Sequence, residues 1–223
     1  SYRTVQVIDS NAVLPTISAP FGISGAVYNP TAQTLTVCAN NPMTYKVKAT
    51  TTLPGAQIVL ESNAPATTPG AVVSYYGQSS DSAVYTFSWT PHKSDGGQHY
   101  VYVDAVDTAC GPNRFPIHQS KGLTIVVYAA KIHATKTRLC QGESVTLQSW
   151  STAAFRQWSV LSGDPTLPCG NCASITLTPS VTTTYVLEEE LGACSGLRDT
   201  VTIEVIPSFS LHARDTSFAG GIP

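Results

Sequence analysis

The sequence predicts an all-β chain of two antiparallel β-sandwich domains in tandem, and three observations lead to this prediction. Apolar residues recur at every second position in short runs, for example at Val145 and Leu147, which is the period of a half-buried strand. Gly, Pro, Asn and Asp separate these runs, and no segment keeps the 3.6-residue period of a helix. At 223 residues the chain is long enough for two domains of ordinary size, each a Greek-key sandwich.

The first predicted domain covers residues 20–130. Residues 1–19 before it are interpreted as the end of a preceding repeat or as a linker. The stretch 62–70 is rich in Pro, Ala and Thr and is expected to be a loop, too polar and too broken for a helix. The expected strands of this domain cover residues 34–38, 44–49, 57–60, 72–76, 85–89, 100–106 and 123–127.

The second predicted domain covers residues 131–207. Its Trp158 and the Trp89 of the first domain are expected to fill the two cores, as a central-strand Trp does in related sandwiches, whereas the position of Trp150 stays open. The triplet of glutamates at 188–190 is expected to be a solvated turn at a strand end rather than an acidic site. The expected strands of this domain cover residues 145–149, 182–187 and 200–205.

Two internal similarities indicate a tandem array. The order of cysteine, turn and alternating run that begins at Cys38 occurs again at Cys140. Residues 210–221 line up with residues 131–142, so that the segment 208–223 is expected to be the start of a further repeat. The chain would therefore be cut from a longer protein, or would have lost a signal peptide, since none is found in it.

Composition excludes several classes of function. The net charge of −2 argues against nucleic-acid binding and against a basic membrane patch, and no apolar run approaches the roughly 20 residues that span a bilayer. The sequence contains no GxSxG, HExxH, GxxxxGK[ST] or GxGxxG motif, and its five histidines are scattered without ligand spacing. We therefore expect no enzyme and no resident cofactor.

Six cysteines with a single methionine suggest an oxidising compartment. They allow 15 connectivities, but pairing within domains leaves one partner for each cysteine once the local CxxC pair has formed. The alternatives for CxxC are half a zinc site, which lacks a second ligand pair, and a redox motif, which lacks the helix that should follow it. The expected disulfides are Cys38–Cys110, Cys140–Cys194 and Cys169–Cys172.

Calcium is the one further metal ion for which the sequence offers candidate ligands. Asp104 and Asp107 lie near the end of a predicted strand and Asp95 precedes it, and Ca²⁺ prefers carboxylate oxygens. The spacing matches no loop that fixes a coordination sphere, so a capped turn is the favoured interpretation.

The aromatic residues pose a similar question about ligands. A sugar-stacking strip on one sheet face is one hypothesis for four exposed-type tyrosines, and a surface without a ligand is the other. The tyrosines are Tyr75, Tyr76, Tyr100 and Tyr102.

Several features of the second domain form a recognisable series along the chain. They are 140–147 (CQGESVTL), Trp158, Cys169–Cys172, 178–185 (TPSVTTTY), Cys194 and 199–205 (DTVTIEV). In these residues the domain resembles the immunoglobulin-like (PKD-like) repeats of large cell-surface adhesins of Bacteroidetes, including the gliding-motility adhesins of the SprB type. The order FSWTP, turn, YVYVDAVD and Cys110 in the first domain is similar to other Ig-like or cadherin-like repeats of these bacteria.

The resemblance implies an extracellular, cell-surface protein exported by type IX secretion, with tandem Ig-like domains that act as structural and adhesive units. Its partners would be neighbouring repeats of the same chain, surface polysaccharide or other surface proteins. The alternative is a carbohydrate-binding or accessory module of a secreted polysaccharide-degrading enzyme.

The resemblance also implies O-linked glycans. The sequence has no Asn-x-Ser/Thr site with an allowed middle residue, so N-linked modification is not expected. Surface proteins of Bacteroidetes carry O-glycans on Ser or Thr that follows Asp and precedes a small or apolar residue. Ser82, Thr108 and Thr200 fit this pattern, and unmodified hydroxyls are the alternative at each site.

Overall fold

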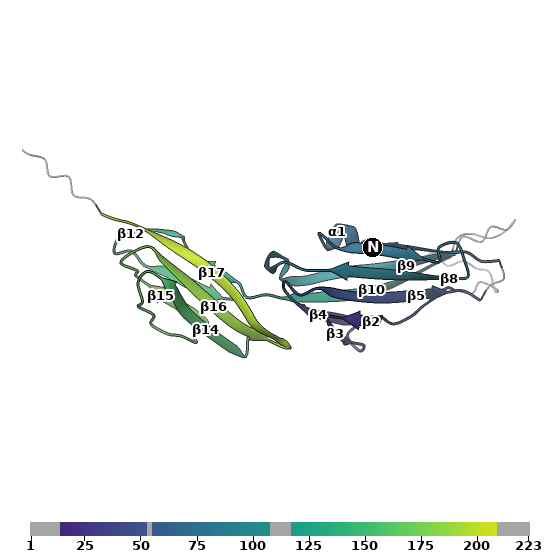
Figure 1. The fold of residues 1–223 in the computed structure, drawn as a ribbon, viewed down its shortest axis with the longest axis horizontal. Coiled ribbons are helices and arrows are strands. Elements are labelled where there is room, and N and C mark those ends of the chain that lie inside the picture. The colour runs from purple at the N-terminus through teal and green to yellow at the C-terminus, as the bar shows by residue number, and fades with distance from the viewer. Residues whose placement is uncertain (1–13, 53–54, 108–116, 209–223) are drawn as a thin grey trace, which may run out of the picture. The chain divides into compact units, whose positions relative to one another are not determined.

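A computed structural model describes residues 14–52, 55–107 and 117–208 of the chain (Figure 1). The described residues divide into two compact units. Unit 1 takes the residues up to Ala130 together with the short segments 152–154 and 189–197, and unit 2 takes the others. Both units are built almost entirely of β-strands.

Unit 1 contains two sheets in its described residues. In the first the strand order is β1-β5-β8-β7, with β2 also pairing with β5, and in the second it is β3-β4-β10-β9-β6. These pairs are antiparallel except that β4 runs parallel to β10. The strands are β1 (Thr16–Ile17), β2 (Phe21–Ser24), β3 (Val27–Asn29), β4 (Thr34–Cys38), β5 (Met43–Thr50), β6 (Ile58–Ser62), β7 (Val72–Tyr76), β8 (Ser82–Trp89), β9 (Gly97–Asp107) and β10 (Ile117–Tyr128).

The core of unit 1 lies between these two sheets. Every second residue of β5 and β8 is buried, as the alternation of the sequence predicts, and the inward side chains of β4, β6, β9 and β10 meet them. Tyr45, Tyr85 and Phe87 pack ring to ring, with centroids 5.0–6.0 Å apart. Trp89 is buried as expected, and its indole donates a hydrogen bond of 3.0 Å to the carbonyl of Pro69.

Unit 2 is a smaller sandwich. Its sheets have the strand orders β11-β13-β15 and β12-β17-β16-β14, and β12 runs parallel to β17. Trp158 lies in the centre of the core between them, as the sequence predicts, together with Leu147, Tyr185 and Ile203. The strands are β11 (Ile132–Ala134), β12 (Arg138–Cys140), β13 (Val145–Ser149), β14 (Phe155–Ser162), β15 (Ser174–Leu177), β16 (Thr183–Leu191) and β17 (Cys194–Ile206).

Two local predictions are wrong. The stretch 62–70 contains a one-turn helix, α1 (Ala64–Thr67), because Pro65 near its start needs no amide partner there and suits the first turn. The glutamates at 188–190 are part of β16 rather than a turn. The side chain of Glu189 is buried, whereas Oε1 of Glu188 lies 3.6 Å from Nε of Arg198 in an ion pair.

The start of the described chain differs from the linker interpretation as well. Residues Thr16–Ile17 pair with β5 and extend the sheet of unit 1, because the second residue of β1 packs against the core. Within the described ranges, no helix is long and apolar enough to cross a membrane.

Candidate functional site

The disulfide between Cys38 and Cys194 is the structural feature that sequence reasoning missed. Its Cα atoms are 5.6 Å apart, which is within the ordinary range for a disulfide, and its cysteines are 156 residues apart in the chain. The expected pairs Cys38–Cys110 and Cys140–Cys194 are therefore wrong. Cys110 lies outside the described residues, and Cys140 is exposed and has no disulfide partner among those that are described.

The chain brings Cys38 to this place through the pairing of β4 with β10. Cys38 is the last residue of β4 and stands opposite Tyr128, the last residue of β10. The amide of Ala39 donates to the carbonyl of Tyr128 at 2.8 Å, so the chain stays beside β10 for one residue beyond the strand. Asn40 then turns away with a positive φ of 65°, a conformation that Asn adopts more readily than most residues.

Cys194 begins β17 directly after the turn of the β16–β17 hairpin. The end of this hairpin, residues 189–197, belongs to unit 1. Here Leu191, Cys194 and Leu197 are buried in a small cluster with Ala130. The apolar side chains on both sides of the turn thus surround the sulfur atoms, and Cys38, Tyr128 and Ala153 pack against them.

Glycine is required in the turn of this hairpin for two reasons. Gly192 has a φ of +59°, which side-chain-bearing residues rarely adopt. A Cβ atom at this position would also lie 2.9 Å from Cε2 of Tyr128, so the tyrosine ring lies directly against the turn. We call the ensemble of Cys38, Tyr128, Leu191, Gly192, Cys194 and Leu197 the disulfide joint.

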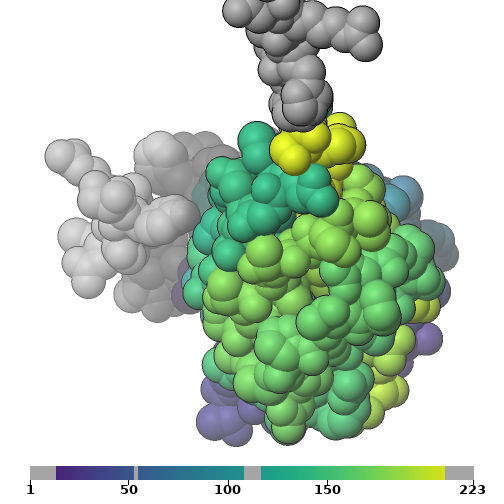
Figure 2. All heavy atoms as spheres, turned by 90° about the vertical axis from the view of Figure 1, so that its left-hand side faces the viewer, coloured from purple at the N-terminus to yellow at the C-terminus, as the bar shows by residue number. Residues whose placement is uncertain are grey.

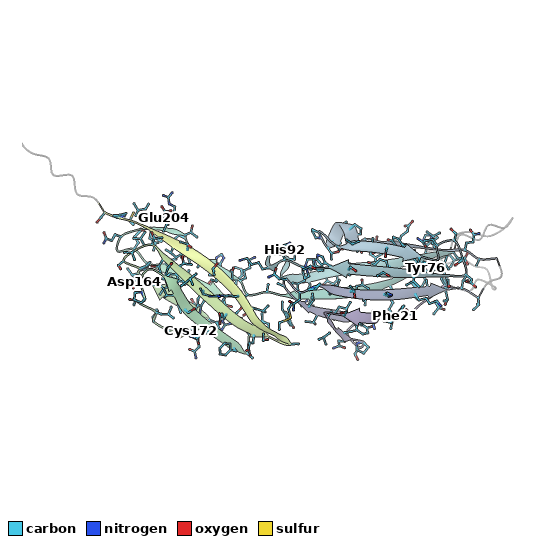
Figure 3. All side chains as sticks on the ribbon, in the orientation of Figure 1. Phe21, Tyr76, His92, Asp164, Cys172 and Glu204 are labelled. Atoms are coloured by element: carbon cyan, nitrogen blue, oxygen red, sulfur yellow. A yellow bond between two sulfur atoms is a disulfide. The ribbon has the colours of Figure 1, made fainter. Side chains whose placement is uncertain are left out.

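The Cys169–Cys172 disulfide, expected from the sequence, is present with a Cα–Cα distance of 5.8 Å. It closes the loop between β14 and β15, and this loop lies against Trp158. The Trp158 amide donates to the carbonyl of Gly170, and its indole donates to the carbonyl of Cys172 at 2.8 Å (Cys172 is labelled in Figure 3). The pair therefore fastens a loop over the core tryptophan.

The three carboxylates considered for calcium do not converge. Asp95 precedes the 11-residue strand β9, and Asp107 is its last residue. Asp104 accepts hydrogen bonds from Ser120 at 2.8 Å and interacts with His118 Nδ1 at 3.0 Å. Among the described residues, no group of three or more His, Cys, Asp or Glu side chains could hold a metal ion.

The structure also separates the four tyrosines of the hypothetical sugar strip. Tyr75 and Tyr76 lie on β7 in one sheet, whereas Tyr100 and Tyr102 lie on β9 in the other. The ring of Tyr75 packs on that of Tyr85 with centroids 5.8 Å apart, whereas Tyr76, labelled in Figure 3, is 81% exposed. The hypothesis that the four tyrosine rings form one strip on one sheet face is therefore wrong.

An exposed aromatic pair that the sequence left open lies on unit 2. Trp150 is 74% exposed, and its ring stacks on that of His133 with centroids 4.6 Å apart and an interplanar angle of 27°. His133 is opposite Gln148 in the pairing of β11 with β13, which explains how the two rings meet. Sequence spacing alone could not reveal this pair, because its members belong to different strands.

The candidate glycosylation sites lie at different kinds of position. Thr200 is exposed on β17, and Ser82 is the partly buried first residue of β8. Thr108 lies outside the described residues. Asp199, which precedes Thr200, accepts a hydrogen bond of 2.9 Å from the amide of Ile132.

Asp164 is the described carboxylate with the most marked electrostatic environment. It accepts hydrogen bonds from the amides of Thr166 and Ser180 and from the Ser180 hydroxyl, at 2.8–3.0 Å. The side chain of Thr166, followed by these donors, holds the pKa of the Asp164 carboxyl well below its ordinary value. Because all its partners lie in loops beside β14 and β16, the group fastens these loops and has no catalytic partner among them.

Comparison with known proteins leaves the family of the chain undetermined. No family model matches it, and no curated protein is similar in sequence. Among solved structures, it is similar to the ectodomain of mouse nectin-like molecule 4, with 14% identity over 89% of this chain and 66% of that chain and a TM-score of 0.43.

Two further matches have lower TM-scores. Protocadherin Gamma B2 matches with 10% identity over 92% of this chain and 42% of that chain, at a TM-score of 0.40. Mouse Cadherin-23 matches with 14% identity over 87% of this chain and 66% of that chain, at a TM-score of 0.37. The chain thus spans two thirds or less of the length of these proteins. At such scores the matches identify no family, and the fold follows from the chain's own sheets: tandem immunoglobulin-like β-sandwiches.

Proposed function

We propose that the chain is a non-enzymatic structural segment of a secreted cell-surface protein, in which repeated Ig-like domains hold an adhesive part away from the cell. The Cys38–Cys194 disulfide is the observation that carries this proposal. It closes a covalent loop that contains most of the two sandwiches. A force on the ends of the chain would therefore bypass that loop, which suits a protein that transmits tension.

The bond also bears on the location. A disulfide of this kind persists where the surroundings are oxidising, as they are outside the cell. A second disulfide, Cys169–Cys172, supports the same compartment. An extracellular or surface location is therefore part of the proposal.

The finer proposal is a gliding-motility-type adhesin of Bacteroidetes, exported by type IX secretion. It rests on the residues of the second domain that resemble repeats of those adhesins. Neighbouring repeats of the same chain would then be its direct partners, and surface polysaccharide or other surface proteins its more distant ones. O-glycans at Ser82, Thr108 and Thr200 belong to this finer proposal.

The proposal is tested on intact cells of the source organism. Antibodies raised against the 223-residue chain are expected to label cells that have not been permeabilised. Replacing residues 14–208 in the parent protein by a flexible Gly/Ser linker of equal length should reduce attachment of the cells to a surface while leaving the amount of exported protein unchanged. Absence of surface labelling, or full attachment with the linker, would contradict the proposed function.

The alternative is a carbohydrate-binding accessory module, and the exposed aromatic pair Trp150–His133 favours it. Aromatic faces open to water are what sugars stack on, and Tyr76 and Tyr100 are also exposed. Binding of the isolated chain to soluble polysaccharides, measured by isothermal calorimetry, tests this alternative. Saturable binding that is lost in Trp150→Ala but kept in Tyr76→Ala would favour it over the structural role.

A further inference from the structure

Cys140 occupies in unit 2 the position that Cys38 occupies in unit 1. Each cysteine is the last residue of a short strand, β4 or β12, that runs parallel to the last strand of its sandwich, β10 or β17. Each also stands opposite the last residue of that strand. Cys38 faces Tyr128, and Cys140 faces Ile206.

Two backbone hydrogen bonds next to Cys38 have counterparts next to Cys140. In both units the residue after the cysteine donates its amide to the carbonyl of the opposite strand residue. In both units the third residue after the cysteine donates its amide back to the carbonyl of the cysteine. These bonds are Ala39–Tyr128 at 2.8 Å and Asn41–Cys38 at 3.1 Å in unit 1, and Gln141–Ile206 at 3.0 Å and Glu143–Cys140 at 3.0 Å in unit 2.

The two positions differ in what covers them. In unit 1 the hairpin end 189–197 supplies Cys194, and the ring of Tyr128 lies against its turn at Gly192. In unit 2 the thiol of Cys140 is exposed, and the apolar side chain of Ile206 beside it is 38% exposed. Figure 2 looks onto this end of unit 2, where the yellow end of β17 and the teal segment that includes β12 lie side by side.

We propose that Cys140 forms a disulfide with a cysteine in the hairpin between the last two strands of a further Ig-like domain, which follows in the same polypeptide. The hairpin of β16 and β17 gives the form of the expected partner: a glycine in the turn, a cysteine two residues later and leucines on both sides, as in Leu191-Gly-Ala-Cys194-Ser-Gly-Leu197. Such an end would cover Ile206 as residues 189–197 cover Tyr128. The proposal rests on the proposed function, because it requires a tandem array.

The direction of the proposed bond follows from the bond that exists. Cys38 pairs with a cysteine that comes later in the chain, in the hairpin of the second sandwich. By the same order, the partner of Cys140 lies in the next domain after unit 2. A repeated joint of this kind would fasten each domain covalently to the one that follows it.

The chemistry is an ordinary thiol oxidation. The Cys140 thiol and the partner thiol each lose one proton and together lose two electrons, and one S–S bond forms. The acceptor is an external disulfide, of protein or small-molecule class, which is reduced to two thiols by exchange. Cys38–Cys194 needs the same class of oxidant.

The test is a disulfide map of the mature polypeptide isolated from cells of the source organism. Free thiols are blocked with iodoacetamide, and the protein is then digested without reduction and analysed by mass spectrometry. The peptide that contains Cys140 is expected to be joined to a peptide of the following domain whose cysteine stands two residues after a turn glycine. The Cys38–Cys194 cross-link in the same digest is the positive control.

Three results would overturn the proposal: a Cys140 blocked by iodoacetamide, a Cys140 joined to Cys140 of another molecule, or a Cys140 joined to Cys110. Cys140→Ser in the parent protein is the matched variant, and it should remove the proposed cross-link while Cys38–Cys194 stays intact. The proposed function fails by a different observation, the absence of surface labelling, so the two failures can be told apart.

Discussion

The disulfide joint makes a quantitative prediction about the stretched chain. When the ends of the 223-residue chain are pulled apart, residues between Cys38 and Cys194 cannot extend while their disulfide is intact. In Cys38→Ser this loop opens and adds 156 residues to the path between the ends. At roughly 3.3–3.6 Å for each extended residue, the fully unfolded length should increase by roughly 510–560 Å.

Single-molecule force spectroscopy with handles at both ends measures this length directly. Cys140→Ser is the matched control, because it removes a thiol that forms no disulfide with any cysteine among the described residues and should leave the length unchanged. In the chain-entropy description, opening a loop this long should also lower the free energy of unfolding by about 5 kcal/mol. Equal contour lengths for the wild-type chain and Cys38→Ser would refute the pairing.

Three further predictions concern the cores and the titrating groups. Trp158→Ala should lower the free energy of unfolding by about 3–5 kcal/mol in a urea titration, because Trp158 is buried in the core. Trp150→Ala should lower it by less than about 1 kcal/mol, because Trp150 is exposed. Equal losses would contradict the assignment of Trp158 to the core and Trp150 to the surface. Because the pKa of Asp164 is lower in the native state, its carboxylate stabilises the fold above the unfolded pKa of about 3.9, and this stabilisation is lost as the pH falls toward the native pKa. The urea midpoint of Asp164→Asn should therefore decline less between pH 5 and pH 2 than that of the wild type. Burial raises the pKa of Tyr85 to about 12, so the contribution of Tyr85 to the free energy of unfolding is present below the unfolded pKa of about 10 and is lost as the pH rises toward 12. In a titration followed by tyrosinate absorbance near 295 nm, Tyr85→Phe should lack one group that titrates late in the wild type. An unchanged titration curve would contradict the burial of Tyr85.

The strands that carry alternating apolar residues could be predicted from the sequence. The ranges 34–38, 72–76 and 145–149 coincide with β4, β7 and β13, because burial on one side imposes a period of two on residues of this length. The expected ranges missed the short strands β1, β2, β3, β11, β12 and β15, because two to four residues are too few to show a period. They also missed the eight-residue β14, in which Trp158 alone is fully buried, so that its sequence shows no alternation.

The disulfide joint could not be predicted because the pairing was assumed to stay within domains. The observed partner of Cys38 lies in a hairpin end that belongs to unit 1 although the rest of its strands belong to unit 2. One signal was available in the sequence: Leu191 and Leu197 on both sides of Cys194 are apolar residues at a place where a solvated turn would be polar. Apolar side chains at a hairpin end indicate that the end is covered.

The most direct test of this account is a non-reducing peptide map of the 223-residue chain, secreted into an oxidising medium and blocked with iodoacetamide before digestion. The account predicts a cross-link between the peptides that contain Cys38 and Cys194, a second link between Cys169 and Cys172, and a blocked thiol at Cys140. Cross-links Cys38–Cys110 and Cys140–Cys194 in their place would show that each domain closes its own disulfide, and would contradict the joint on which the proposed structural role depends.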